Sequence, residues 1–319
     1  MSWSITSAQL ESASDVVSKH AVETRLLAVP ALGENVWLKL ECEQHTGSFK
    51  FRGALSRLAA LDSSARARGV LTASAGNHGY GLARAGTLLD VPVTVFVAAS
   101  TPAVKREGIA AAGATLEVID VPGYDAVEAR AKEAAVERGL PFVSPFDDPV
   151  VAAGNGGTVM AEILRACPTV RTVVAPVGGG GLMAGIAAAR RWSDADFAII
   201  GVQSEACPAM VQSLAEGRAR LTYEGTATLA EGLEGGVSRA TFEIARDELQ
   251  GMHAVTEAQV ADAMCFASTE LGLSIEGSAA VVIAWLKLHV SELDGPVVGV
   301  VSGGNVDPKR LADLLVAAD

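Results

Sequence analysis

The sequence contains few aromatic residues and no excess of positive charge. Phe, Trp and Tyr together make up 5% of its 319 residues, so we expect a core built mainly from aliphatic side chains and alanine. Acidic residues outnumber basic ones, and the formal net charge is −12. A surface of this sign repels phosphate groups, which argues against a partner such as nucleic acid or an anionic membrane.

Cysteine is also scarce, and no two cysteines form a Cys-x-x-Cys pair. This spacing favours free thiols in a reducing compartment over a disulfide framework or a metal site, for all four of them: Cys42, Cys167, Cys207 and Cys265. The first residues, MSWSITSAQLESASDVV, lack the cationic and apolar segments of a signal peptide. No apolar run is long enough to span a membrane without a glycine or proline. We therefore expect a cytoplasmic protein.

The chain is rich in aliphatic residues and glycine, with 50% hydrophobic residues and 33 glycines, as is typical of a globular enzyme. Its length suits two domains. Strands are expected at residues 36–41, 69–72, 91–97, 115–118, 141–143, 172–176, 197–203 and 296–302. Helices are expected near residues 7–19, 53–60, 101–112, 125–138, 152–166, 208–216, 237–249, 256–271 and 278–289, and after the glycine loops. This alternation predicts an α/β fold with parallel sheets covered by helices on both faces.

Glycine-rich loops follow several of the predicted strands, where open α/β sheets bind their ligands. Gly178–Gly181 follows the strand TVVAP and opens a helix, so its backbone N–H groups can form a nest for an anion such as a phosphate. The loop is not a Walker loop, because no Gly-Lys-Ser/Thr follows, and it does not match the dinucleotide fingerprint. A tight turn without a ligand is the alternative interpretation.

Two further loops, Ser74–Gly79 (SAGNHG) and Ser302–Asn305 (SGGN), also follow strands, and TGSFKFRGA places Lys50 between two phenylalanines. A lysine in a poorly solvated pocket has a lowered pKa and can form a Schiff base with an aldehyde. A phosphate nest beside such a lysine suggests a phosphorylated aldehyde cofactor, pyridoxal 5'-phosphate. The alternatives are a solvated lysine and ordinary turns.

The ordered motifs TGSFKFRGA, SAGNHGYGLA, PFDDPVVAAGNGG, GGGGL, TLAEGLEGG, EGSAA and VVSGGNVD resemble those of fold-type II pyridoxal-phosphate enzymes, closest to the serine/threonine dehydratase and serine racemase group. The resemblance extends from about residue 20 to residue 307. It implies the tryptophan synthase β-like fold, with two three-layer αβα domains and the cofactor between them. A large domain would comprise residues 1–52 and 147–319, and a small domain residues 53–146.

The resemblance also implies roles for individual residues. Lys50 would bind the cofactor covalently and act as the acid/base at Cα of the substrate. The other cofactor contacts would be Phe49 along the ring, Asn77 at the ring hydroxyl, Gly232 near the ring, Ser302 at the ring nitrogen, and the backbone N–H groups of Gly178, Gly179, Gly180, Gly181 and Leu182 at the phosphate. The substrate carboxylate would be held by the loop Ser74, Ala75, Gly76, Asn77 and His78, and Phe146 would line the pocket for the β-substituent.

Ser302 has a consequence for the reaction. A neutral hydroxyl, unlike a carboxylate, does not keep the ring nitrogen protonated, so the ring is a weaker electron sink. A substrate with a leaving group at Cβ then favours β-elimination, which here gives water, a 2-oxo acid and ammonia.

Several positions depart from the resemblance. Residues 153–157 read AGNGG, where relatives have AGQGT. Many relatives bind a divalent cation through a Glu-x3-Ala-x-Asp spacing; Glu205 and Ala209 match it, but Val211 replaces the second carboxylate, and Glu231 stands where Asp is frequent. A hard cation needs several oxygen ligands, so a divalent or monovalent cation site is doubtful. Only one short helix is expected after Asp307, without a regulatory domain.

The substrate is expected to be a small-molecule amino acid, with L-threonine or L-serine as the first choice and an apolar wall at Phe146. Bulkier β-hydroxy amino acids, phenylserine-like or derived from osmolytes, remain alternatives. Serine racemase is the near rival, although Ala75 lacks the hydroxyl that racemases use opposite the lysine. Cysteine-synthase-type β-replacement and a non-catalytic cofactor-binding protein are weaker alternatives. The resemblance also implies a homodimer.

Overall fold

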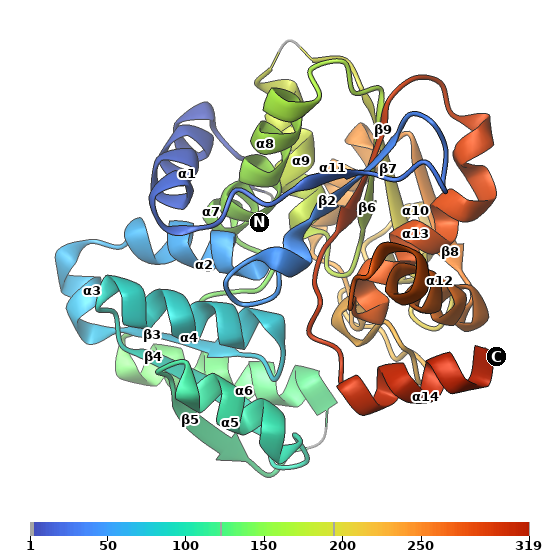
Figure 1. Ribbon diagram of the computed structural model, residues 1–319. Coiled ribbons are helices and arrows are strands. Elements are labelled where there is room, and N and C mark those ends of the chain that lie inside the picture. The colour runs from blue at the N-terminus through green and yellow to red at the C-terminus, as the bar shows by residue number, and fades with distance from the viewer. Residues whose placement is uncertain (1–2, 122, 194, 319) are drawn as a thin grey trace.

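The computed structural model describes residues 3–121, 123–193 and 195–318, and Figure 1 shows two sheets side by side. The larger sheet has the strand order β1-β2-β9-β6-β7-β8, and all its pairs are parallel except β1 with β2. The smaller sheet has the order β3-β4-β5 and is entirely parallel. The strands are β1 (Leu26–Ala28), β2 (Val36–Leu40), β3 (Val70–Ala73), β4 (Val93–Ala98), β5 (Thr115–Ile119), β6 (Thr172–Pro176), β7 (Ala198–Ser204), β8 (Gly251–Val255) and β9 (Val297–Val301).

Helices cover both faces of the large sheet (Figure 1). The central strands β6 and β9 are fully buried and rich in valine, as expected of strands covered on both faces. On one face, α13 (Gly277–His289) packs against the strands, α12 (Glu257–Leu271) packs on α13, and α14 (Pro308–Ala318) packs on α12. The other face packs against α8 (Thr158–Ala166), α9 (Gly181–Arg191), α10 (Ala209–Glu216) and α11 (Arg239–Glu248).

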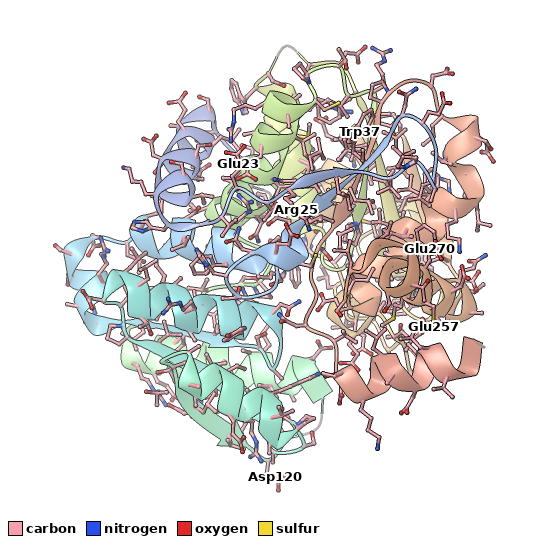
Figure 2. The ribbon with its side chains drawn as sticks, in the orientation of Figure 1. Glu23, Arg25, Trp37, Asp120, Glu257 and Glu270 are labelled. Atoms are coloured by element: carbon pink, nitrogen blue, oxygen red, sulfur yellow. The ribbon has the colours of Figure 1, made fainter. Side chains whose placement is uncertain are left out.

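The small sheet is covered in the same way. On one face lie α2 (Lys50–Ala59), α4 (Asn77–Leu89) and α5 (Ala103–Ala111), and on the other α6 (Gly123–Arg138). The remaining helices are α1 (Ser7–His20), α3 (Ser63–Arg68) and α7 (Pro149–Ala152). The single turns are the π-helical η2 (Ala153–Gly157) and the 3-10 turns η1 (Glu41–Glu43), η3 (Glu231–Leu233) and η4 (Val290–Glu292). Many charged side chains lie on the surface, as exposed Asp120 and Glu270 do in Figure 2. Among the described residues, no helix is both long and apolar enough to cross a membrane.

The predicted α/β class with parallel sheets is confirmed. The helices expected near residues 7–19 and 256–271 form as α1 and α12, which begin with capping boxes at Thr6 and Thr256. The strand expected at residues 141–143 is wrong. This segment forms only an isolated bridge between Leu71 and Phe142. Pro141 lacks an N–H donor, and Pro145 follows closely, so the ladder cannot extend in either direction.

The predicted domain boundary after residue 52 falls inside α2, which begins at Lys50 and not near Gly53. This helix packs against α4 and also against η2. One helix therefore contacts elements on both sides of the boundary. The division into a small domain, residues 53–146, and a large domain stays a prediction, although β3, β4 and β5 all lie within that range.

Candidate active site

Three of the predicted loops lie at the carboxyl ends of parallel strands, after β3, β6 and β9. Two of them lead directly into helices, so the N-terminus of α4 follows Ser74–Gly76 and the N-terminus of α9 follows Gly178–Gly180. Helix N-termini carry partial positive charge and unpaired N–H groups. The fold therefore supplies two separate sites for anionic groups near Lys50, which begins α2.

Among the described residues, Lys50 has one close polar contact. Its Nζ donates a hydrogen bond to the carbonyl oxygen of Pro145 at 3.0 Å and lies 5.0 Å from the centroid of the Phe49 ring. The surrounding protein atoms desolvate the ammonium and lower the pKa of Lys50 to about 8, although the negative charge of Glu276 opposes this shift. An amine with a pKa near neutrality is available both as a nucleophile toward an aldehyde and as a base.

The glycine loop has the features of a phosphate site. Within the described residues, the N–H groups of Gly178, Gly179 and Gly180 donate no hydrogen bond. Gly180 has a φ of +93°, which an L side chain rarely adopts, and this turn directs the chain into α9. Unpaired donors at the start of a helix fit the phosphate of pyridoxal phosphate without further change.

Phe146 lies against this loop. A Cβ atom added to Gly179 would come within 2.3 Å of the Phe146 ring, so the aromatic ring occupies the space that a side chain would need there. The backbone of Phe146 also lies close to Gly181, at 2.9 Å from an added Cβ. The sequence predicted that Phe146 lines the pocket for the β-substituent. Its observed contact is with the phosphate loop, and the substrate contact stays a prediction.

Asn77 lies in a hydrogen-bonded group that includes a residue the sequence analysis missed. Its Nδ2 donates to the carboxylate oxygens of Glu276 at 2.8 and 3.0 Å, and its Oδ1 accepts from Nδ2 of Asn305 at 2.7 Å. Burial raises the pKa of Glu276 to about 7, although hydrogen bonds from Asn77 and the backbone of Asn305 and the charge of Lys50 favour its ionised form. Glu276 begins the EGSAA motif, but a separation of 199 residues from Asn77 hides the pair from any local pattern.

Ser302 and Gly232 are predicted to contact the cofactor ring, and those roles stay predictions. Ser302 is 2% exposed, and its hydroxyl makes no hydrogen bond in the part of the chain that is described, while its carbonyl accepts from Phe49 N–H at 3.1 Å. The Ser48 hydroxyl, two residues before Lys50, is likewise buried without a partner. Gly232 donates to the Ser278 hydroxyl at 2.8 Å. The unpaired hydroxyls and the glycine loop fit a polar cofactor.

The loop Ser74–His78 is partly open. Gly76 is exposed, Ser74 and Ala75 are half-buried, and the Ser74 hydroxyl accepts from the Gly76 N–H at 3.2 Å. His78 is buried, and its Nε2 lies 3.3 Å from the Val143 carbonyl oxygen. Ala75 presents no hydroxyl. The free N–H groups at the start of α4 suit a carboxylate.

A buried group of charges lies beneath Lys50 and was not predicted. Arg52 is fully buried and pairs with Glu41 at 2.7 Å and with Glu162 at 2.6 Å, and Glu162 also pairs with buried Lys39. Two cations and two anions balance, which a buried cluster requires. Nearby, Asn155 of the AGNGG turn accepts from the Gly53 N–H at 2.8 Å. These contacts fix the first turn of α2, and with it the position of Lys50.

The residues predicted for a cation do not form a suitable set of ligands. Glu205 is exposed, and the Ala209 carbonyl already accepts the Ser213 hydroxyl at 2.6 Å. Glu231 instead pairs with Lys105 at 2.9 Å and with Arg310. Over the described ranges, no group of three or more His, Cys, Asp or Glu side chains could hold a metal ion. The donors present do not fit a divalent cation.

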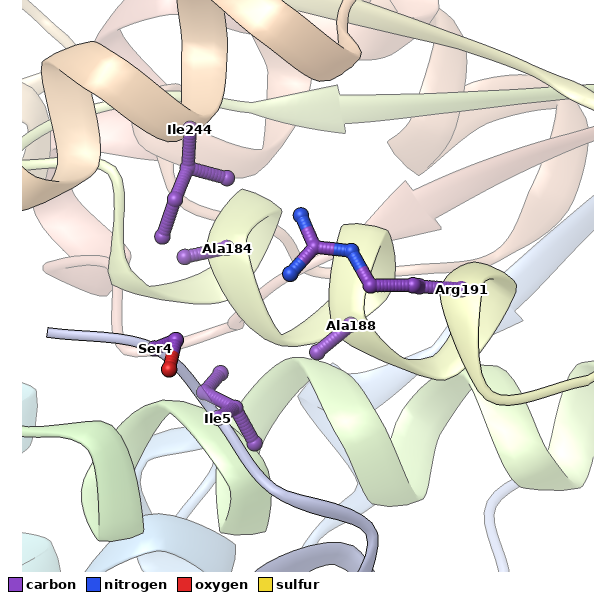
Figure 3. Close-up of a pocket in the computed structure, with 6 residues that line it drawn as sticks. All are labelled: Ser4, Ile5, Ala184, Ala188, Arg191 and Ile244. Atoms are coloured by element: carbon purple, nitrogen blue, oxygen red, sulfur yellow. The ribbon is translucent and has the colours of Figure 1, made fainter.

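A small cavity of about 10 Å³ lies elsewhere, and Figure 3 shows its lining. It is formed by the N-terminal segment, α9 and α11 through Ser4, Ile5, Ala184, Ala188, Arg191 and Ile244. None of the predicted site residues lines it. Its volume holds about one water molecule, so it is not a substrate site.

The family described as "Pyridoxal-phosphate dependent enzyme" matches residues 17–303. The chain belongs to this family. It is 40% identical over 311 residues to an L-threonine ammonia-lyase from Geobacter sulfurreducens, which covers 95% of this chain and 76% of the relative. Its fold superposes on the processed form of threonine deaminase isoform 2 from Solanum lycopersicum with a TM-score of 0.89 and 30% identity, over 100% of this chain and 96% of that one. Maize serine racemase gives a TM-score of 0.90 and 25% identity, over 99% and 98%. The predicted fold type is therefore confirmed, and pyridoxal phosphate is the cofactor of the family.

Proposed function

We propose that this protein is a pyridoxal-phosphate-dependent lyase that converts L-threonine, and L-serine as a second substrate, into a 2-oxo acid and ammonia. The similarity to an L-threonine ammonia-lyase over 95% of the chain supports the substrate class. The observation that carries the chemistry is Lys50, an amine with a pKa of about 8. Its Nζ contacts the carbonyl of Pro145, and the next residue, Phe146, packs on the glycine loop.

The N-termini of the two helices would bind different anionic groups. The N-terminus of α9, after the glycine loop, would hold the cofactor phosphate. The N-terminus of α4, with the loop Ser74–His78, would hold the substrate carboxylate. The Ser302 hydroxyl would meet the ring nitrogen, and Asn77 the ring hydroxyl. With the cofactor phosphate and the substrate carboxylate both fixed, the Cα–H bond of the substrate can be oriented toward Lys50.

Bound pyridoxal phosphate supplies an electron sink for Cα of the amino acid. Lys50 Nζ, in its uncharged form, takes the proton from Cα. The β-hydroxyl then leaves with a proton as water, and a double bond forms between Cα and Cβ. The released unsaturated amine takes up water and gives the 2-oxo acid and ammonia, so atoms balance without any oxidant.

Serine racemase is the second candidate, because the maize enzyme has a similar fold. A racemase must move protons on both faces of Cα, and Lys50 serves only one. Ala75 lies in the loop where a hydroxyl would serve the other face. Elimination needs only one face, so the lyase is preferred. Bulkier β-hydroxy amino acids also fit the proposal, since Phe146 is the only predicted side-chain contact in that part of the pocket.

Other properties stay predictions. A homodimer and a cytoplasmic location rest on the resemblance and on the composition alone. A cation is not part of the proposal, because the charge of Glu231 is matched by Lys105 and Arg310. The test is to supply β-hydroxy L- and D-amino acids, serine and threonine among them, and to rank the rates of 2-oxo acid formation. L-threonine and L-serine should lead, and release from none of them would contradict the proposal.

A further inference from the structure

The carbonyl group of Val143 is held by two donors from the small sheet and α4. It accepts the Thr72 hydroxyl at 2.8 Å, and Nε2 of His78 lies 3.3 Å from it. The N–H of Val143 donates to the Leu71 carbonyl at 2.8 Å. Val143 and Thr72 are fully buried, and His78 is 3% exposed. The backbone N–H and the carbonyl of Val143 are therefore both held by hydrogen bonds in a region without solvent.

The contact with Val143 determines the tautomer of His78. A carbonyl oxygen only accepts, so Nε2 must carry the hydrogen and Nδ1 must be an acceptor. Nδ1 is buried and has no partner among the described residues. Burial, and then the charge of Lys50, lower the pKa of His78 to about 3, so the ring is neutral throughout the physiological range. His78 is thus a fixed neutral donor and not a proton carrier in its resting position.

Two residues beyond Val143, the Pro145 carbonyl accepts the Lys50 ammonium. Little conformational freedom separates the two carbonyls. The proline ring fixes φ of Pro145 and also restricts the residue before it. The Ser144 hydroxyl accepts the N–H of Asp147 at 3.0 Å and closes the turn, and the Phe146 ring is held against Gly179. A displacement of Val143 is therefore transmitted to the Pro145 oxygen.

We propose that His78 is a positioning residue: its neutral imidazole holds the Val143 carbonyl and so places the Pro145 carbonyl that receives the protonated side chain of Lys50. The inference rests on the proposed function and adds to it a defined resting place for Lys50 after it takes the proton from Cα. The charged group that acts on Lys50 is Glu276, which favours the ammonium form. The neutral His78 adds no charge of its own.

The sign of the pH effect follows from this geometry. A hydrogen bond to the ammonium form raises the pKa of an amine, so loss of the Pro145 acceptor lowers the pKa of Lys50. The acid limb of the kcat profile would then move to lower pH, while kcat itself falls because the lysine is less well placed. A change in general stability alone would not move the limb.

The test compares His78→Met, which removes the donor, with His78→Gln, which keeps a neutral N–H donor and cannot titrate. With L-threonine, we expect His78→Met to lower kcat about tenfold and to shift the acid limb to lower pH. His78→Gln should recover most of kcat and return the limb to its original pH. Thr72→Val, on the same carbonyl, should give a smaller shift in the same direction, and Thr72→Ser is the matched control that keeps the hydroxyl.

A second measurement does not depend on turnover. Amide hydrogen exchange of Val143, Phe146 and Asp147 in the cofactor-free protein should be faster in His78→Met and Thr72→Val, but not in His78→Gln, with α12 as the internal reference. If His78→Met does not fold, Thr72→Val carries the test. Unchanged exchange and an unmoved limb would overturn the proposal, and so would equal impairment of the Met and Gln variants. Absence of any lyase activity together with the expected exchange pattern would reject the proposed function and leave the positioning role standing.

Discussion

The side-chain amide of Asn77 donates to both carboxylate oxygens of Glu276, at 2.8 and 3.0 Å, and so joins the start of α4 to the start of α13. The two residues are 199 positions apart and lie beside different sheets. Their contact connects the residue predicted to meet the cofactor ring with a carboxyl group whose pKa is raised to about 7. This hydrogen-bonded pair therefore fixes the position of Asn77 and also makes the site sensitive to the protonation of Glu276.

The first prediction concerns Glu276→Gln. A carboxyl group whose folded-state pKa is raised destabilises the folded protein once it ionises, fully above pH 7 and not at all well below its ordinary pKa. Without cofactor, the variant should be more stable than the natural protein by about 2 kcal/mol at pH 8, and the difference should shrink toward pH 4.5. Urea unfolding at several pH values measures this. A difference that is constant with pH would show that the Glu276 carboxyl does not titrate as described.

The second prediction concerns the lysine. Lys50→Ala should leave the fold intact and remove the visible absorbance of covalently bound pyridoxal phosphate, with a loss of turnover of about a thousandfold or more. Lys132→Ala, on the surface of α6, is the matched control and should keep both properties. An absorbance spectrum and an oxo-acid assay suffice. A Lys50→Ala protein with the original spectrum and full turnover would mean that another amine binds the cofactor.

The third prediction tests the role of Ser302. Ser302→Asp would place a carboxylate at the ring nitrogen and raise the pKa of that nitrogen, which strengthens the electron sink. We expect elimination about tenfold slower and a larger share of exchange at Cα without loss of the hydroxyl. Solvent deuterium incorporation into recovered L-threonine, compared with oxo-acid release, measures this share. Ser302→Thr keeps the hydroxyl and is the control. An unchanged ratio in the Asp variant would remove the electronic argument.

The fourth prediction concerns the missing hydroxyl at Ala75. Pure L-serine or L-threonine should give oxo acid with little or no D-isomer on a chiral column, because only one face of Cα has a base. Ala75→Ser should introduce D-serine at about a hundredth or more of the elimination rate. Ala75→Gly is the control without a hydroxyl and should not do so. Racemisation by the natural protein as fast as oxo-acid formation would contradict the proposal that a base serves only one face of Cα.

Local patterns predicted most of the sheet and the cofactor loops. The buried strands β6 and β9 are short valine-rich runs that end in glycine, so hydrophobicity and turn residues agree there. The edge strands β1 and β8 were missed, because Leu26–Ala28 is only three residues long and Gly251–Val255 contains a glycine and an exposed histidine. Edge strands are only partly buried, so their sequences are constrained less strongly.

Long-range pairs account for what the sequence could not predict in the site. Lys50, Asn77, Ser302 and the glycine loop carry local motifs. Glu276 and Arg52 do not, because each is defined by partners far along the chain: Asn77 for the first, and Glu41 and Glu162 for the second. Phe146 shows the converse limit, since its sequence places it near the site but does not specify that its ring packs on Gly179.

The central claim is tested most directly by incubating the purified holoenzyme with L-threonine and measuring 2-oxo acid and ammonia in the same sample. The account predicts equal amounts of the two products, with rates that rise with pH as Lys50 loses its proton near pH 8. Lys50→Ala should form neither product. A holoenzyme that carries pyridoxal phosphate on Lys50 but releases no 2-oxo acid from L-threonine, L-serine or any bulkier β-hydroxy amino acid would contradict it.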